Sequence, residues 1–130
     1  MHSAFSLIVS LLLLTCLESS SAATSGESPR GVKMTFLLIY RPGPAWPHGA
    51  KVSELPLREH GNYMLSLYTR GAMTLAGPLT DDAGGAVVLE VADESEANAV
   101  VANDPAVKAG IFVPEVHPWA PVHWEKYRKK

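Results

Sequence analysis

The sequence has very little cysteine, and several common catalytic motifs are missing from it. Cys16 is the single cysteine among the 130 residues, so the chain forms neither an internal disulfide nor a cysteine metal site. Gly84-Gly85 lacks the lysine and helix that complete a phosphate-binding loop. No Gly-x-Ser-x-Gly nucleophile elbow occurs. These absences exclude disulfide scaffolds, P-loop chemistry and the elbow of the serine hydrolases.

The two signs of charge are nearly balanced. The chain has 11 Lys and Arg against 13 Asp and Glu, a formal net charge of -2. Proteins that bind nucleic acid present a strongly basic face, so we expect no nucleic-acid partner. The basic residues gather only in the tail, residues 121–130, which we expect to be a solvated terminus.

The histidines do not form a metal-binding pattern. The chain has five His, and none shows the i, i+4 pairing of a His-Glu-x-x-His helix or another tight ligand spacing. We therefore expect no metal, and no motif calls for another cofactor.

The N-terminus is typical of an export signal. Residues 4–15 are mostly apolar, a run too short to span a bilayer. Ser21 and Ala23 fit the small-x-small cleavage rule, which predicts a signal peptide over residues 1–23 and a periplasmic or secreted protein. No Lys or Arg precedes the apolar run. The alternatives are a lipid anchor on Cys16, since Leu13-Leu14-Thr15-Cys16 resembles a lipobox, or an uncleaved anchor.

The rest of the chain reads as one domain, residues 33–120, after a linker of residues 24–32. Turn residues and apolar patterns predict four strands and two main helices. The expected strands are residues 34–40, 72–76, 86–91 and 111–117, and the helices lie at 57–70 and after a capping box that starts at Asp93. Asp104 is expected to cap a further single-turn helix that Pro105 opens.

The predicted order is β-α-β-β-α-β, which indicates an α+β, ferredoxin-like fold with two helices on one face of an antiparallel sheet. Residues 34–40 form a continuous apolar run, as in a central strand that is buried on both faces. A second copy of the domain would cover the other face, so we expect a homodimer built as a dimeric α+β barrel. Pro114 predicts a bulge or an edge position for the last strand.

Several short motifs appear in a characteristic order. His60 precedes Gly71 by eleven residues, Ala76-Gly77-Pro78 ends a strand, and Asp104-Pro105 is followed by Lys108-Ala109-Gly110 and a late Pro118-Trp119. In this arrangement the chain resembles the YCII-related (YciI-like) domain over about residues 33–120. The resemblance implies a ferredoxin-like fold, a dimer, and a pocket near the histidine.

The resemblance also implies a pair of candidate catalytic residues. His60 matches the histidine of the family, and Asp104 matches the aspartate of its Asp-Pro motif. The chain departs from the pattern after the first strand, where some members have an acidic residue and this sequence has Arg41-Pro42. Asp104 has an alternative role as a helix cap alone, and a single helical histidine is more often structural than catalytic.

An imidazole near neutrality can take or give a proton. We expect His60 to act as an acid or base on a small aromatic or enol-forming molecule, in a cofactor-free reaction of lyase or isomerase type. Arg41 is a candidate for holding an anionic group, and Trp46, Tyr63 and Trp119 are candidates for flat apolar walls. The alternative is a non-catalytic dimeric module that binds a small ligand or serves an accessory role.

Overall fold

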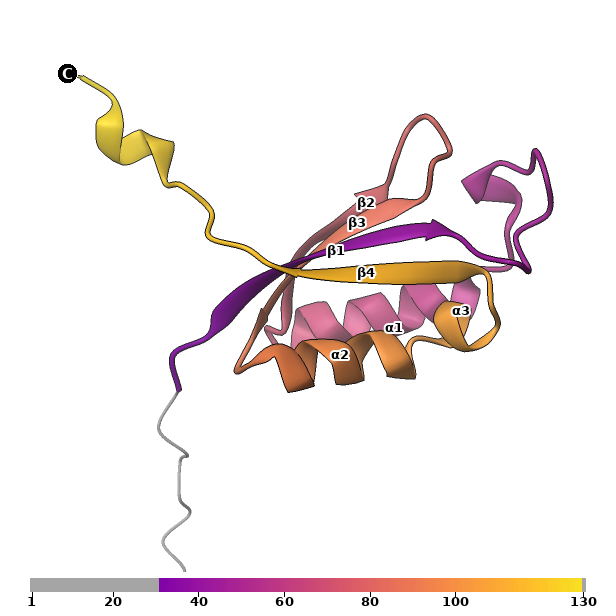
Figure 1. Ribbon diagram of the computed structural model, residues 1–130, viewed down its shortest axis with the longest axis horizontal. Helices are drawn as coiled ribbons and strands as arrows, with labels where there is room; N and C mark the ends of the chain where they lie inside the picture. The colour runs from indigo at the N-terminus through magenta and orange to yellow at the C-terminus, as the bar shows by residue number, and fades with distance from the viewer. Residues whose placement is uncertain (1–30, 130) are drawn as a thin grey trace, which may run out of the picture.

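The computed structural model describes residues 31–129 and contains one four-stranded sheet with helices on one side (Figure 1). The main elements are β1 (Met34–Pro42), α1 (Arg58–Thr69), β2 (Met73–Pro78), β3 (Gly85–Val91), α2 (Glu94–Asn103), α3 (Pro105–Lys108) and β4 (Phe112–Pro118). Two short 3-10 helices, η1 (Val52–Glu54) and η2 (Trp124–Tyr127), lie in the loop after β1 and in the tail.

The strands lie in the order β2-β3-β1-β4, and each neighbouring pair is antiparallel. Figure 1 shows all three α-helices beneath the same face of this sheet, and no helix or strand of residues 31–129 lies over the opposite face. This is the β-α-β-β-α-β arrangement, so the predicted ferredoxin-like α+β fold is confirmed.

The core forms between the helices and every second residue of the two central strands. On β1, Phe36, Leu38 and Tyr40 are at most 1% exposed. Their neighbours Leu37 and Ile39 point to the opposite face and are only half-buried. Burial on both faces, which the apolar run predicted, is therefore wrong for a single chain.

Helix α1 contacts the core along one stripe of its surface. Met64 and Leu67 are buried, whereas Leu65 and Tyr68 are 63% and 60% exposed. Tyr68 follows Met64 by four residues, a spacing that puts both side chains on one side of a helix. The structure shows that the buried stripe instead follows the positions of His60, Met64 and Leu67, which rotates Tyr68 toward solvent.

The predicted helix caps are confirmed. The Asp93 carboxylate accepts a hydrogen bond from Glu96 N at 2.8 Å at the start of α2. The Glu96 side chain accepts from Ala92 N at 2.8 Å, one residue earlier than in the expected capping box. Asp104 caps α3 by accepting from Ala106 N at 2.9 Å. These caps determine where α2 and α3 begin. Because Asp104 lies between the two helices, they also determine its position.

Strand β4 is an edge strand of the sheet, as Pro114 predicted. The predicted signal peptide, its alternative lipid anchor on Cys16 and most of the predicted linker lie outside the described residues. Within residues 31–129, none of the helices is both long and apolar enough to cross a bilayer.

A close approach of two backbones shapes the end of the sheet where β1 finishes. Gly84 lies in the turn between β2 and β3 with a φ of +126°, and a Cβ added there would lie 1.8 Å from the carbonyl oxygen of Tyr40. Only glycine fits both the dihedral angle and the contact. The turn therefore lies against the end of β1.

We expect Gly84→Ala to lower the free energy of unfolding by roughly 2–4 kcal/mol, because the methyl group separates the turn from β1. Urea denaturation measures the change. Gly49→Ala is the matched control, since Gly49 also has a positive φ but no atom within 4 Å of the added Cβ. It should cost only about 1 kcal/mol. Equal losses in the two variants would contradict this account of the turn.

Candidate active site

An imidazole and a fully buried carboxylate meet between α1 and the start of α3. His60 Nδ1 lies 2.9 Å from each oxygen of the Asp104 carboxylate. The Asp104 side chain has no exposed surface, and the His60 side chain is 17% exposed. A carboxylate only accepts hydrogen bonds, so Nδ1–H of His60 is the donor. The neutral ring then carries its lone pair on Nε2.

The chain positions Asp104 through its own backbone. Its N–H donates to Val101 O at 3.3 Å at the end of α2, while its side chain caps α3. The Asp-Pro sequence therefore joins two helices and holds the carboxylate still. A buried charge is costly unless it is paired, and His60 is the side chain that pairs with it.

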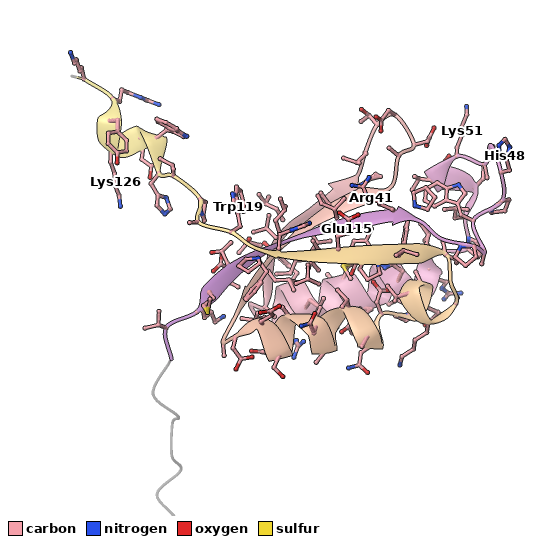
Figure 2. The ribbon with its side chains drawn as sticks, viewed as in Figure 1. Arg41, His48, Lys51, Glu115, Trp119 and Lys126 are labelled. Carbon is pink, nitrogen blue, oxygen red and sulfur yellow. The ribbon has the colours of Figure 1, made fainter. Side chains whose placement is uncertain are left out.

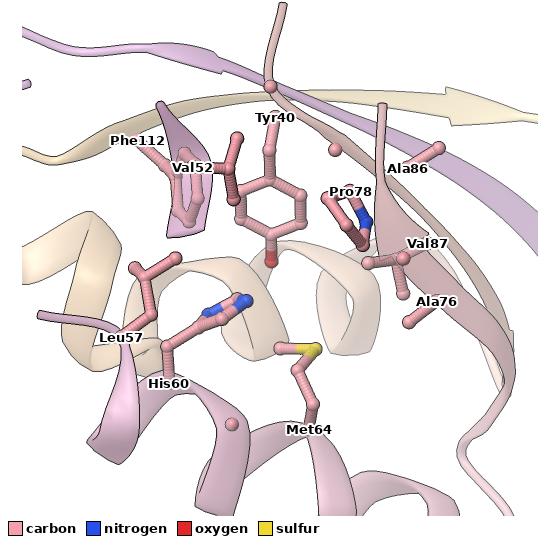
Figure 3. Close-up of a pocket in the computed structure, with 14 residues that line it drawn as sticks. Tyr40, Val52, Leu57, His60, Met64, Ala76, Pro78, Ala86, Val87 and Phe112 are labelled. Atoms are coloured by element: carbon pink, nitrogen blue, oxygen red, sulfur yellow. The ribbon is translucent and has the colours of Figure 1, made fainter. Parts of the chain in front are cut away.

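An apolar cavity of about 250 Å³ lies beside His60 (Figure 3). It lies at the end of the sheet where β1 and β2 finish and β3 and β4 begin. Its larger apolar lining residues are Val52, Leu57, Met64, Pro78, Val87 and Phe112. Among its lining side chains, only those of Tyr40 and His60 carry a hydrogen-bonding nitrogen or oxygen. An apolar cavity of roughly 150 Å³ is enough to bind benzene, so this one accommodates a single substituted ring.

The first turns of α1 leave room for a ligand. Gly61 lines the cavity, and no atom lies within 4 Å of a Cβ built on it. A side chain here would extend into this space. Gly61 has a weak helix propensity, so its place in α1 costs stability and leaves this part of the cavity wall without a side chain.

Aromatic rings hold the His60 imidazole in place. Tyr40 meets it edge-on with ring centroids 5.8 Å apart, and Phe112 lies at 5.3 Å. Such contacts contribute to ring orientation as well as to packing. Neither residue was among the site residues predicted from the sequence. The alternation along β1 puts Tyr40 on the same face as Phe36 and Leu38, but only the structure shows that this face meets the helices.

The hydroxyl of Tyr40 is a buried polar group without a partner. No group among residues 31–129 meets it with the full geometry of a hydrogen bond, although the Asp104 carboxylate lies close enough to interact with it. Burial, and then the nearby charge of Asp104, raise the pKa of Tyr40 far above its usual value. The phenol therefore stays protonated and acts as a donor at any working pH.

None of the four predicted substrate-binding residues is on the wall of this cavity. Arg41 points to the uncovered face of the sheet, where it forms an ion pair with Glu115 across the β1–β4 pairing (Figure 2). This hydrogen-bonded pair lowers the pKa of Glu115. Trp46 instead packs on Phe112, with centroids 5.7 Å apart, and donates from Nε1 to Ala50 O.

The other two residues lie elsewhere as well. Tyr63 faces α2, where its hydroxyl donates to Val100 O at 2.9 Å. Trp119 follows β4 at the opposite end of the sheet and is 44% exposed (Figure 2). These residues were chosen by type, but their positions depend on strand register and helix packing. In the part of the chain that the structure describes, no three His, Cys, Asp or Glu side chains gather into a possible metal site.

We expect Asp104→Ala to abolish the preference of neutral His60 for the Nδ1–H tautomer, which nitrogen NMR of the ring measures. It should also lower the free energy of unfolding by about 2 kcal/mol, because it leaves buried donors unpaired. Asp93→Ala is the matched control, since Asp93 also caps a helix but does not contact His60. That variant should lose about 1 kcal/mol and keep the tautomer. An unchanged His60 spectrum in Asp104→Ala would overturn the assigned pairing.

A protein-family model and a solved structure are similar to this chain. No curated protein matches the sequence. The structure is similar to that of 5-chloro-2-hydroxyhydroquinone dehydrochlorinase (TftG) from Burkholderia phenoliruptrix AC1100 in complex with 2,5-dihydroxybenzoquinone, with a TM-score of 0.52 and 24% identity over 74% of this chain and 100% of that one. The model of the YCII-related domain matches residues 34–120. The chain therefore belongs to the YCII-related domain family.

Proposed function

We propose that this protein is a cofactor-independent enzyme of lyase or isomerase type, in which His60 moves a proton on a small enol-forming or aromatic molecule. One observation carries the proposal. The imidazole has Nδ1 bound to a fully buried carboxylate, while Nε2 has no protein partner among the described residues and the ring lines an apolar cavity. A base, its orienting acid and a space for the reactant thus lie together.

The chemistry follows from this geometry. Nε2 of His60 takes a proton from a C–H or O–H of the bound molecule, and the resulting imidazolium is stabilised by the Asp104 carboxylate. The imidazolium then returns the proton to another atom of the same molecule in an isomerisation, or to a leaving group in an elimination. The reaction involves no net oxidation. The apolar walls strengthen the electrostatic interactions by excluding water.

The structural neighbour supports the class of molecule. That protein is a dehydrochlorinase of a substituted ring, and it was observed with 2,5-dihydroxybenzoquinone. A single ring of this kind suits a cavity of about 250 Å³. The argument for this chain rests on its own His60, Asp104 and cavity, and the neighbour supplies the choice of ring compounds as probes.

A second candidate function is that of a small-ligand-binding or accessory module. It is favoured by the scarcity of polar groups in the cavity, where only Tyr40 and His60 provide side-chain hydrogen bonds. A binding site needs no proton transfer. Enzyme and binding module therefore differ in whether His60 is needed for chemistry or only for contact.

We expect His60→Gln to slow catalysed proton exchange by about a hundredfold or more, because glutamine cannot act as the base. Proton NMR in deuterated buffer follows the exchange, with cyclohexane-1,4-dione as a small enolisable probe. His123→Gln is the control, since His123 is exposed in the tail and far from the cavity. If the wild-type protein binds the dione without speeding its exchange, the binding module is the better account.

We also propose that the chain forms a homodimer through the uncovered face of its sheet. Leu37 lies directly opposite Val88 on this face, and Leu75 of β2 pairs with Val88 in turn. Leu75 and Val113 are 70% and 48% exposed in the single chain. Exposed apolar side chains on one face of a sheet are typical of an interface, and a second copy would bury them in a dimeric α+β barrel.

We expect Leu37→Lys to weaken the dimer at least tenfold, because it places a charge in the centre of the buried face. Sedimentation equilibrium over a range of concentrations measures the dissociation constant. Leu65→Lys is the control, since Leu65 is exposed on α1, away from this face. A monomeric wild-type protein, or equal dissociation constants for all three proteins, would contradict the proposed interface.

Export stays part of the proposal. Its support is the apolar run of residues 4–15 followed by small residues up to Ala23. The alternative is a lipid anchor on Cys16. N-terminal sequencing of the mature protein tells the two apart, because cleavage after Ala23 removes Cys16 and lipoprotein processing leaves it as the first residue.

A further inference from the structure

We propose that the Tyr40 hydroxyl binds an oxygen atom of the ligand, so that the cavity selects rings that carry a phenol, enol or carbonyl oxygen. The inference rests on the proposed function, because it takes the cavity beside His60 as the ligand site. It adds a specificity-determining residue and a chemical class of ligand. Its evidence is the position of the hydroxyl, its lack of a partner, and the chemistry of the surrounding walls.

Tyr40 reaches the cavity from the end of β1. The side chain is 1% exposed, and its ring packs edge-on against His60 and Phe112. Figure 3 shows the hydroxyl pointing toward the space between His60 and Met64. The hydroxyl is therefore next to the imidazole, at the inner end of the cavity.

The hydroxyl is a donor in need of an acceptor. A buried polar group without a hydrogen bond costs free energy that a suitable partner would recover. The phenol does not ionise there, since burial and then the charge of Asp104 raise the pKa of Tyr40. It consequently favours a ligand atom that accepts a hydrogen bond over one that donates.

Asp104 is the competing acceptor within the protein. Its carboxylate already accepts hydrogen bonds from His60 Nδ1 and Ala106 N. The Tyr40 hydroxyl lies close enough that, in addition to burial, the charge of this carboxylate and then hydrogen bonding to it raise the pKa of Tyr40, but the two groups do not meet with the full geometry of a hydrogen bond. The other side chains around the cavity are apolar apart from His60, so a ligand oxygen is the acceptor that the site lacks.

A ligand oxygen reaches the hydroxyl if Met64 moves. Met64 lies beside Tyr40 at the cavity wall (Figure 3), and its unbranched thioether adopts alternative rotamers easily. The remaining walls are formed by branched, aromatic or backbone groups that move less. The inner end of the cavity is thus adaptable on the side where the oxygen would enter.

His60 and Tyr40 would then have different roles in proton transfer. Nε2 of His60 removes a proton from the carbon next to a carbonyl, and the C–H electron pair forms the C=C bond of an enolate. The carbonyl π electrons move to the oxygen, where the Tyr40 O–H donates a hydrogen bond to the new negative charge. No proton leaves Tyr40, and no electrons are gained or lost overall.

The test compares the binding of phenol and toluene, which differ in shape by little more than hydroxyl for methyl. Isothermal titration calorimetry on the full-length protein gives both dissociation constants for the wild type, Tyr40→Phe and Tyr63→Phe. We expect Tyr40→Phe to weaken phenol relative to toluene by about tenfold, the usual effect of one hydrogen bond of about 1.4 kcal/mol. Tyr63→Phe is the matched control, because that hydroxyl already donates to Val100 O outside the cavity.

Thermal melting checks that the variants fold. Tyr40→Phe should melt at or above the wild-type temperature, because it deletes an unpartnered donor, and Tyr63→Phe should melt lower. The inference is overturned if Tyr40→Phe leaves the ratio of the phenol and toluene dissociation constants unchanged. It is also overturned if neither probe binds the wild type. An unchanged ratio would indicate that the Tyr40 hydroxyl donates its hydrogen bond to Asp104 and not to the ligand.

The outcome is separate from that of the proposed function, since binding requires no turnover. Selective phenol binding without catalysed proton exchange would support this role for Tyr40 and contradict the proposed enzymatic function. Proton exchange that depends on His60, together with an unchanged ratio of the phenol and toluene dissociation constants, would support the enzymatic function and contradict this role for Tyr40.

Discussion

The carboxylate of Asp104 is fully buried, and the hydrogen bonds of this residue connect three helices. Its backbone ends α2, its side chain caps α3, and its two oxygens accept from His60 on α1. His60 and Asp104 are 44 residues apart in sequence, so their contact ties the first half of the fold to the second. A buried carboxylate that loses one of these donors is expensive. The same constraint orients the imidazole toward the cavity.

The one-sided sheet explains the rest of the architecture. All three α-helices cover the face that carries Phe36, Leu38 and Tyr40, and the cavity opens at the end of that face where Gly84 lets the β2–β3 turn approach β1. The opposite face keeps an apolar centre with the Arg41–Glu115 ion pair beside it. Site and proposed interface are therefore on different surfaces. A change in one face need not disturb the other.

Much of the fold could be predicted because its signals are local. Turn residues, helix caps and Pro114 each act over a few positions, and together they predicted the order of elements and the edge position of β4. The family motifs indicated His60 and Asp104, and the structure brings them together. The rest of the site depends on contacts between distant residues.

Residues chosen by type alone lie outside the cavity for this reason. Arg41 was expected to meet a ligand, but the β1–β4 register brings it to Glu115. Tyr63 was expected in the pocket, but helix packing brings its hydroxyl to Val100. Tyr40 and Leu37 are both apolar positions of one strand, and only the placement of the helices shows which of them faces the cavity.

The central claim is that Nε2 of His60 is available in the cavity while Nδ1 is held by Asp104. Diethyl pyrocarbonate modification, read by mass spectrometry with and without saturating phenol, tests this availability most directly. The account predicts that His60 is modified and that phenol protects it, whereas the exposed His123 is modified equally in both conditions. If His60 does not react, or if phenol leaves its rate of modification unchanged, Nε2 is not the group that meets the ligand.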